Sequence, residues 1–132
     1  MKKDINFGLL LLRIIIAGLM LFHGIAKLKS LAGIENMLTE AGFPTFMAYG
    51  VYITELVAPI LIIIGFRTRI ASLVFFFGMI AALVLVHSDH IFAISKTGGL
   101  EIELLLLYAF GSLVFYFTGS GSYAVSTTNK WD

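Results

Sequence analysis

Four long apolar stretches dominate the sequence, at about residues 7–26, 48–66, 70–87 and 100–118. Each has roughly the length that a helix needs to cross the ~30 Å hydrocarbon core of a bilayer. Hydrophobic residues make up 59% of the chain and charged residues only 13%, whereas a soluble domain is about half apolar and about a quarter charged. The stretches lack the alternation of apolar and polar residues that a membrane β-barrel needs. The sequence therefore predicts an all-α fold, an integral membrane four-helix bundle that forms a single transmembrane domain over residues 1–132.

The connection between the first and second stretches is long enough to hold a short helix of its own. Apolar residues recur at helical spacing over residues 31–41, and polar residues occupy most of the other side. Gly42 is suited to end such a helix, and Pro44 prevents its continuation. We expect an additional short interfacial helix that covers one end of the bundle. An ordinary connecting helix packed on the bundle is the alternative.

Lysine and arginine residues in the flanks indicate the orientation in the membrane. With four spans, both chain ends and the turn between the second and third spans share one side, which holds Lys2, Lys3, Arg67, Arg69 and Lys130. The other side holds Lys27, Lys29 and Lys96, spread over longer loops. Because basic residues in short loops tend to stay in the cytoplasm, we expect a multi-pass protein of the cytoplasmic (inner) membrane with both termini in the cytoplasm.

Two charged residues of opposite sign lie deepest within the predicted spans. Arg13 is in the first span and Glu55 is in the second. A charge in hydrocarbon costs several kcal/mol unless it is paired, and long side chains could bridge the roughly 10 Å of axial offset that the helical rise implies. We therefore expect Arg13 and Glu55 to form a buried ion pair, which would fix the register of the helices. In the alternative, Arg13 extends to the inner headgroups.

Several polar residues gather toward the outer ends of the spans, namely His23, Tyr52, Glu55, His87 and Glu101. We expect them to line one pocket open to the outer side, where histidine and carboxylate groups could exchange protons with the headgroup of a quinone. Pro59 follows Glu55 by four residues, and the kink that it should introduce would leave room beside that carboxylate. The alternative is that residues such as His87 are polar only because helix ends meet water.

Composition also limits the cofactors and partners. The chain has no cysteine, which excludes disulfides, thiolate metal sites, iron–sulfur clusters and dithiol redox chemistry by the chain itself. His23 and His87 could in principle ligate haem, but both lie at helix ends, and we do not expect haem. The histidine and acidic residues show no tight ligand spacing, so we expect no metal. A net charge of +1 without a basic face argues against nucleic acid as a partner.

Four pieces of the sequence follow one another in an order typical of one family. They are Leu12-Arg13-Ile14 with Phe22-His23-Gly24 and Lys27-Leu28, then Glu55-Leu56-Val57-Ala58-Pro59 leading to Ile64-Gly65-Phe66-Arg67-Thr68-Arg69, then Gly98-Gly99-Leu100-Glu101, and finally Gly119-Ser120-Gly121-Ser122-Tyr123. Over nearly the whole chain this pattern resembles the DoxX family of small four-helix membrane proteins. Ser120 departs from it, because the family usually has a proline there. The residues that match the family's polar pattern are Arg13, His23, Lys27, Glu55 and Glu101.

The resemblance implies a four-helix membrane fold and links to redox systems. Relatives are associated with quinone reduction, thiosulfate oxidation and oxidative-stress complexes. The first hypothesis is therefore a small subunit of a redox or quinone-linked membrane system that acts with a protein partner holding the cofactor. The alternatives are a cofactor-free structural or assembly subunit of a larger complex, and a small transporter working as a homo-oligomer. The sequence does not decide whether the chain is an enzyme, and the expectation leans to no catalytic activity of its own.

Overall fold

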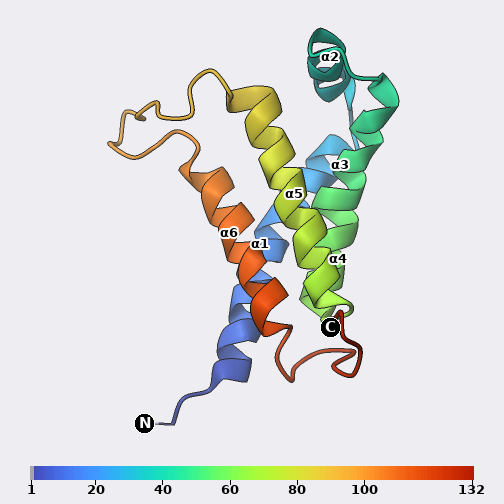
Figure 1. Ribbon diagram of the computed structural model, residues 1–132, viewed down its shortest axis with the longest axis vertical. Coiled ribbons are helices and arrows are strands. Elements are labelled where there is room, and N and C mark those ends of the chain that lie inside the picture. Colours follow the sequence, from blue (N-terminus) through green and yellow to red (C-terminus); the bar gives the residue numbers. More distant parts are fainter. Residues whose placement is uncertain (1) are drawn as a thin grey trace.

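The computed structural model describes residues 2–132 and contains four apolar helical segments that run side by side along the long axis (Figure 1). The first is α1 (Ile5–Lys27), the third is α5 (Thr68–His87) and the fourth is α6 (Glu103–Thr118). The second is composite and consists of a 3₁₀ turn (Thr45–Tyr49), α3 (Gly50–Tyr52), a π-helical turn (Ile53–Val57) and α4 (Ala58–Ile64). A short helix, α2 (Ala32–Glu40), precedes it. The predicted all-α, four-helix membrane bundle with an extra short helix is confirmed.

The four segments differ in how well their lengths match a bilayer. Three are long and apolar enough to cross a membrane, namely Ile5–Lys27, Thr45–Ile64 and Thr68–His87. The fourth, α6, has 16 residues and begins later than the predicted stretch, because the chain still forms turns at residues 101 and 102. At the usual rise this helix is about 24 Å long. A span of this length is accommodated by local thinning of the bilayer at modest cost.

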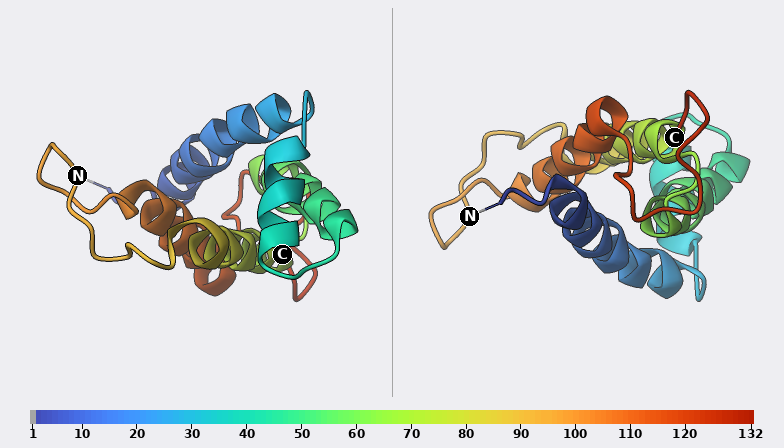
Figure 2. Two further views of the ribbon diagram at one scale, coloured as in Figure 1. Left: turned by 90° about the horizontal axis from the view of Figure 1, so that it is seen from above. Right: turned by 90° about the horizontal axis from the view of Figure 1, so that it is seen from below.

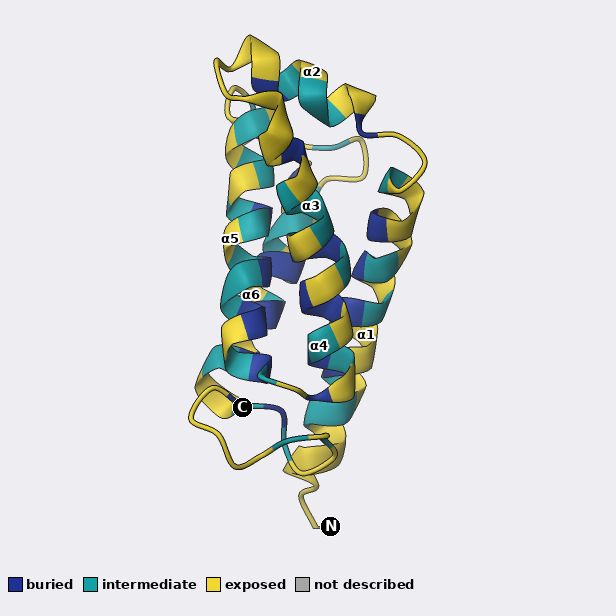
Figure 3. Ribbon diagram, turned by 90° about the vertical axis from the view of Figure 1, so that its right-hand side faces the viewer, coloured by how far each residue is buried: buried dark blue, intermediate teal, exposed yellow. Residues whose placement is uncertain are grey.

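The helices form a ring in which each contacts its neighbours (Figure 2). The α5–α6 contact is the most extensive, and the α6–α1 contact is the smallest. Buried residues face the inside of the ring (Figure 3), and Ile62, Phe75 and Phe115 are among those fully shielded. Large apolar side chains such as Phe22 and Phe117 point outward and are exposed. Since lipid tails are as apolar as these side chains, their exposure carries no cost in a membrane.

The short helix α2 lies across one end of the bundle (Figures 1 and 3). Leu38 is its buried residue and packs in a small apolar cluster with Leu31 and Ala48. The helix ends as the sequence predicts, because Gly42 adopts a positive φ of 84° and the N–H of Phe43 donates to the carbonyl of Leu38 at 2.8 Å. This bond satisfies one of the free carbonyls of the last turn.

Arg13 does not pair with Glu55, and the predicted ion pair is wrong. The guanidinium of Arg13 instead donates to the backbone carbonyls of Ile62, Ile63, Ser120 and Tyr123, at distances between 2.5 and 3.0 Å. Two of these carbonyls belong to the last turn of α4, where the regular helical bonds run out. The carbonyl of Ile62 also accepts a bond of 3.2 Å from the N–H of Gly65 and has a second lone pair for Arg13. Along the second segment they lie about 10 Å closer to Arg13 than Glu55 does, and they accept its hydrogen bonds without a counter-charge.

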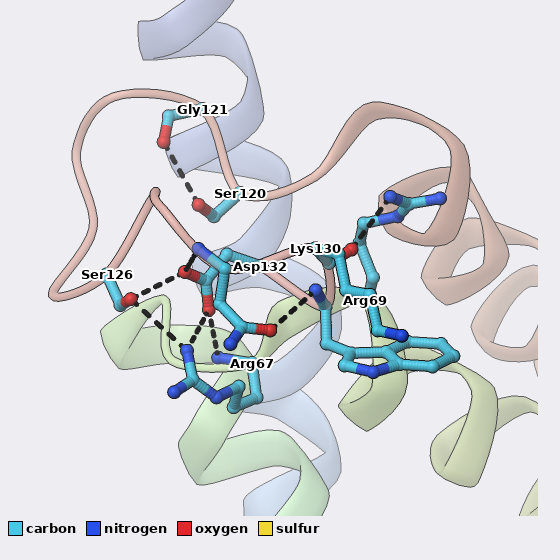
Figure 4. A network of polar contacts seen from close by, with 9 residues as sticks. Arg67, Arg69, Ser120, Gly121, Ser126, Lys130 and Asp132 are labelled. Atoms are coloured by element: carbon cyan, nitrogen blue, oxygen red, sulfur yellow. Dashed lines mark hydrogen bonds and ion pairs between the residues drawn. The ribbon is translucent and has the colours of Figure 1, made fainter.

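The segment after α6 folds back onto the turn between α4 and α5 (Figure 4). The buried carboxylate of Asp132 accepts hydrogen bonds from Arg67 Nη1 at 2.8 Å, from Ser126 Oγ at 2.5 Å and from the N–H of Asn129 at 2.8 Å. Arg67 has a positive φ of 49°, and its own N–H also donates to Asp132 at 3.2 Å. This network joins residues 120–132 to the same end of the bundle that Arg13 holds together.

Replacing Arg13 with leucine should lower the free energy of unfolding by at least about 3 kcal/mol, because charge-assisted hydrogen bonds contribute roughly 1.5–3 kcal/mol each. Denaturant unfolding in detergent, followed by far-UV circular dichroism, measures the loss. The exposed Lys29→Leu change is the control and should stay within about 0.5 kcal/mol of the wild type. A double variant, Arg13→Leu with Glu55→Leu, should be less stable than either single variant. Rescue in the double variant would contradict the carbonyl assignment.

Changing Asp132 to asparagine should destabilise the protein at neutral pH and have little effect in acid. Burial alone would raise the pKa of Asp132, but hydrogen bonds from Ser126, Asn129 and Arg67 hold that pKa well below the ordinary value of 3.8. A carboxylate with a depressed folded-state pKa stabilises fully above its unfolded pKa and loses that contribution as the pH falls toward the folded value. The difference in melting temperature between wild type and Asp132→Asn should therefore begin to shrink below about pH 4 and continue to shrink as the pH falls further. Parallel curves down to acidic pH would contradict the network.

Candidate functional site

A cavity of about 300 Å³ lies among the helices at the end of the bundle that carries α2. Its polar lining comes from α1, the π-helical turn, α5 and the start of the fourth segment, and consists of His23, Lys27, Glu55, His87, Glu101 and Tyr108. Its apolar lining consists of Met20, Met79, Ala82, Val86, Leu104 and Leu105. A few polar groups on apolar walls are the usual composition of a small-molecule site.

An ion pair between Lys27 and Glu55 borders the cavity. Lys27 Nζ lies 2.6 Å and 2.7 Å from the two carboxylate oxygens of Glu55. The glutamate side chain is only 7% exposed, whereas the lysine side chain is 34% exposed. The Lys27 ammonium therefore supplies the partner that the buried Glu55 carboxylate requires. Lys27 also remains accessible from the cavity.

The local backbone explains why Glu55 lies against α1. Gly24 faces it, and a Cβ at this position would collide with the backbone carbonyl of Glu55. Glu55 also lies in the π-helical turn, where the N–H of Ala58 bonds to the carbonyl of Ile53, five residues earlier. Pro59 follows and has no N–H to continue the regular pattern. A π-helical turn thus stands where the sequence predicts a kink, and such turns are frequent at functional sites.

Tyr108 on α6 joins the cavity to the core of the bundle. It is buried, and its ring packs edge-on against His23 with 6.2 Å between the ring centroids. Phe75 of α5 packs on it at 6.3 Å. These ring contacts fix the orientation of Tyr108. Its hydroxyl adds a polar group to the histidine, lysine and glutamate side chains that line the cavity.

A histidine cluster lies at the rim of the cavity, where α5 ends. His87 Nδ1 is 2.8 Å from His90 Nε2, and His90 Nδ1 is 2.7 Å from Asp89 Oδ1. Glu101 lies nearby, with its Oε2 4.0 Å from His90 Nε2. The loop between α5 and α6 brings it back, because the N–H of Glu101 bonds to the carbonyl of Ala93 at 3.0 Å.

The structure brings together most of the residues that the sequence predicts to share a pocket. His23, Glu55, His87 and Glu101 line the one cavity, and their action on a ligand stays a prediction. Tyr52 is not among the lining residues. Its hydroxyl donates to the backbone carbonyl of Lys27 at 3.4 Å, and its ring packs in the apolar cluster beneath α2, where burial of the ring is more favourable than contact with charged groups.

Sequence reasoning missed two residues of this site as members of the pocket. Lys27 matches the family pattern, and it follows Gly24 by three residues and Met20 by seven, which places all three on one face of α1; the sequence-based prediction did not extend from this face to the pocket. Tyr108 follows Glu101 by seven residues and therefore shares its side of the fourth segment. Helical spacing thus carried the signal for both residues. The identity of the acid that Lys27 pairs with could not be obtained from spacing.

A second cavity of about 500 Å³ lies next to the first, beneath α2. Its lining is mostly apolar and includes Leu38, Met47, Phe77 and Leu85. Four residues line both cavities, namely Lys27, Glu55, Ala82 and Val86. The ion pair therefore lies between a polar cavity and an apolar one.

No group of three or more histidine, cysteine or acidic side chains within residues 2–132 is arranged to hold a metal ion. The cavity residues present hydrogen-bond donors, acceptors and titratable groups instead.

Comparison with known proteins assigns the chain to a family. The DoxX family profile matches residues 8–88. "Putative oxidoreductase CatD" of Bacillus subtilis is 32% identical over 91% of this chain and 85% of its own length, and an "Uncharacterized protein" of Haemophilus influenzae is 33% identical over 95% and 92%. "Inner membrane protein YqjF" of Escherichia coli is 28% identical over 99% of this chain and 100% of its own length. No solved structure matches. The chain belongs to the DoxX family of membrane proteins.

Proposed function

We propose that this protein is a small subunit of a redox-linked membrane system and binds the headgroup of a quinone in the cavity beside Lys27 and Glu55. The observation that carries the proposal is the convergence of His23, His87 and Glu101 with the Lys27–Glu55 pair on one cavity with apolar walls. A membrane helix bundle has little reason to bring so many titratable groups together unless they act on a ligand.

The polar groups match what a quinone and its quinol require. Quinone carbonyls accept hydrogen bonds, which the Lys27 ammonium and the Tyr108 hydroxyl can donate. Quinol hydroxyls donate, and a histidine nitrogen or the carboxylate of Glu101 can accept. The cavity of about 300 Å³ is at the small end of the range for ligand pockets, which suits a single substituted ring.

The apolar second cavity supports a ligand that also carries a hydrocarbon tail. It begins at the same ion pair and continues beneath α2 between Val51, Phe77 and Leu85. A ring in the first cavity would leave an isoprenoid tail beside the second, where burial of each CH₂ group contributes about 0.8 kcal/mol. Ala82 and Val86 line both cavities, so they border the route between ring and tail.

The electrons would come from or go to a partner. This chain has no cysteine to carry them, so in the proposed system it supplies the ligand site and a second protein supplies the redox group. A relative whose name is "Putative oxidoreductase CatD" supports a redox setting. If no quinone binds, two alternatives remain. The chain is then a small transporter that works as a homo-oligomer, or a structural subunit of a larger complex.

Binding of ubiquinone-1 should raise the melting temperature of the purified protein in detergent, because a ligand that binds only the folded state stabilises it. Ala82→Leu adds bulk to both cavities without changing a charge, and it should weaken binding about tenfold, or about 1.4 kcal/mol. Isothermal titration calorimetry gives the two affinities. Glu55→Gln removes the counter-charge of Lys27 and should also weaken binding, with some loss of stability.

The matched control is Ala26→Leu, which makes the same change at an exposed position of α1 outside both cavities. It should bind ubiquinone-1 as the wild type does. Equal affinity of Ala82→Leu and Ala26→Leu would place binding elsewhere on the lipid-facing surface. No stabilisation of the wild type by ubiquinone-1 would favour the cofactor-free structural subunit.

We also propose that the end of the bundle with both termini faces the cytoplasm of the inner membrane, so that the cavity opens toward the outer side. The turn between α4 and α5 carries Arg67 and Arg69 at the same end as both termini (Figure 1), and this arrangement fits the preference of basic loops for the cytoplasm. The relative "Inner membrane protein YqjF" supports the choice of membrane.

Single cysteines introduced into the cysteine-free chain should reveal this orientation. Thr128 and Lys96 are both exposed and lie in segments at opposite ends of the bundle. In intact cells a membrane-impermeant maleimide should label Lys96→Cys and leave Thr128→Cys unlabelled until the cells are opened. The reverse pattern would invert the orientation, and labelling of both would mean that the chain inserts in two orientations.

A further inference from the structure

A chain of hydrogen bonds leads from an exposed acid to the rim of the cavity. Asp89 lies in the loop after α5, with its side chain 85% exposed. His90 bridges it to His87, with 2.7 Å from Asp89 Oδ1 to His90 Nδ1 and 2.8 Å from His90 Nε2 to His87 Nδ1. His87 lines the cavity. Water at one end and the cavity at the other are therefore joined through two imidazole rings.

The carboxylate of Asp89 determines which ring nitrogens of His90 and His87 carry protons. An ionised Asp89 can only accept, so His90 must carry a proton on Nδ1 to form their hydrogen bond. A neutral His90 then has a bare Nε2, which accepts a hydrogen bond from the Nδ1–H of His87. His87 Nε2 is left without a proton, and this nitrogen is the one available to the cavity.

We propose that Asp89, His90 and His87 form a proton relay between water and the cavity, with His87 Nε2 as the proton acceptor on the cavity side. A ligand hydroxyl gives its proton to His87 Nε2, the Nδ1 proton of His87 moves to His90 Nε2, and the Nδ1 proton of His90 moves to Asp89. Asp89 then releases a proton to water. Each ring gains one proton and loses one, and both rings then carry the proton on Nε2. From that state the same steps in reverse return a proton to the cavity and restore the Nδ1–H tautomers.

The charges around the relay suit this direction of transfer. The hydrogen bond from His90 lowers the pKa of Asp89, with a smaller lowering from its own backbone N–H and from the charge of His90. Asp89 therefore stays ionised at neutral pH, and once protonated it releases the proton readily to water. Glu101 also lies near the bridging ring, with its Oε2 4.0 Å from His90 Nε2. Lys27 and Glu55 also border the cavity and are paired with each other, so they compete little for the proton.

Nitrogen-15 NMR of the histidine rings in detergent micelles tests the relay without any quinone. The chain has three histidines, and ring nitrogen shifts distinguish Nδ1–H from Nε2–H tautomers. Above the titration range, His87 and His90 should both carry Nδ1–H, although free imidazoles favour Nε2–H. In Asp89→Ala, His90 should change to Nε2–H, and His87 should follow, although Asp89 does not touch it. Exchange of the His87 ring protons with water should slow several-fold.

Two controls isolate the relay. Glu40→Ala removes another exposed acid at the same end and should leave all three rings unchanged, and His23 should be unchanged in every variant. In a His90→Gln background, Asp89→Ala should no longer affect His87, because the bridge is gone. A wild-type His87 with Nε2–H, or one indifferent to Asp89→Ala, would overturn the relay.

The use of this relay by a quinol rests on the proposed function, but its geometry does not. Failure of ubiquinone-1 to bind would leave the tautomer result intact and would change only the ligand. An unchanged tautomer in Asp89→Ala would remove the relay and leave quinone binding in place. The two proposals can therefore fail separately.

Discussion

Hydrocarbon offers a charged side chain no water, so each charge inside this bundle depends on a protein partner. Arg13 meets that requirement with four backbone carbonyls at one end of the bundle, and Lys27 and Glu55 meet it with each other toward the other end. These two sets of contacts hold the other segments around α1. Arg13 gathers the end of α4 and the closing segment around α1, whereas the Lys27–Glu55 pair holds α1 and the π-helical turn together beside a cavity.

The two ends of the bundle consequently differ in how their polar side chains are used. At the Arg13 end, backbone carbonyls satisfy Arg13 and the Asp132 network holds Arg67. Gly65 allows the close approach of the closing segment, because a Cβ there would collide with Ala124. At the other end, Glu101 and the cluster around His87 face a cavity and a loop. Hydrogen bonds to backbone therefore dominate one end, and titratable side chains around a cavity the other.

The candidate site was predictable in part, for identifiable reasons. His23, Glu55, His87 and Glu101 could be placed together because hydropathy sets the spans, and position within a span sets depth. The predicted Arg13–Glu55 pair is wrong because backbone carbonyls at the end of α4 accept hydrogen bonds from a guanidinium, and the pattern of side-chain charges does not reveal them. Tyr52 was misplaced because the apolar cluster under α2 depends on where that helix packs, and this is a tertiary property.

The sequence by itself determined the membrane environment, the helical spans and the end of α2. The features that indicate them, namely apolar length, helical spacing and the Gly42–Pro44 signal, act locally along the chain. Only the tertiary structure decided which acid each base would meet and which histidines would touch. Asp89 and His90 are neighbours in sequence, but the contact of His90 with His87 and the return of Glu101 depend on the fold of the loop. Hydrogen bonds act over about 3 Å, and spacing along a helix fixes side-chain positions far less closely than that.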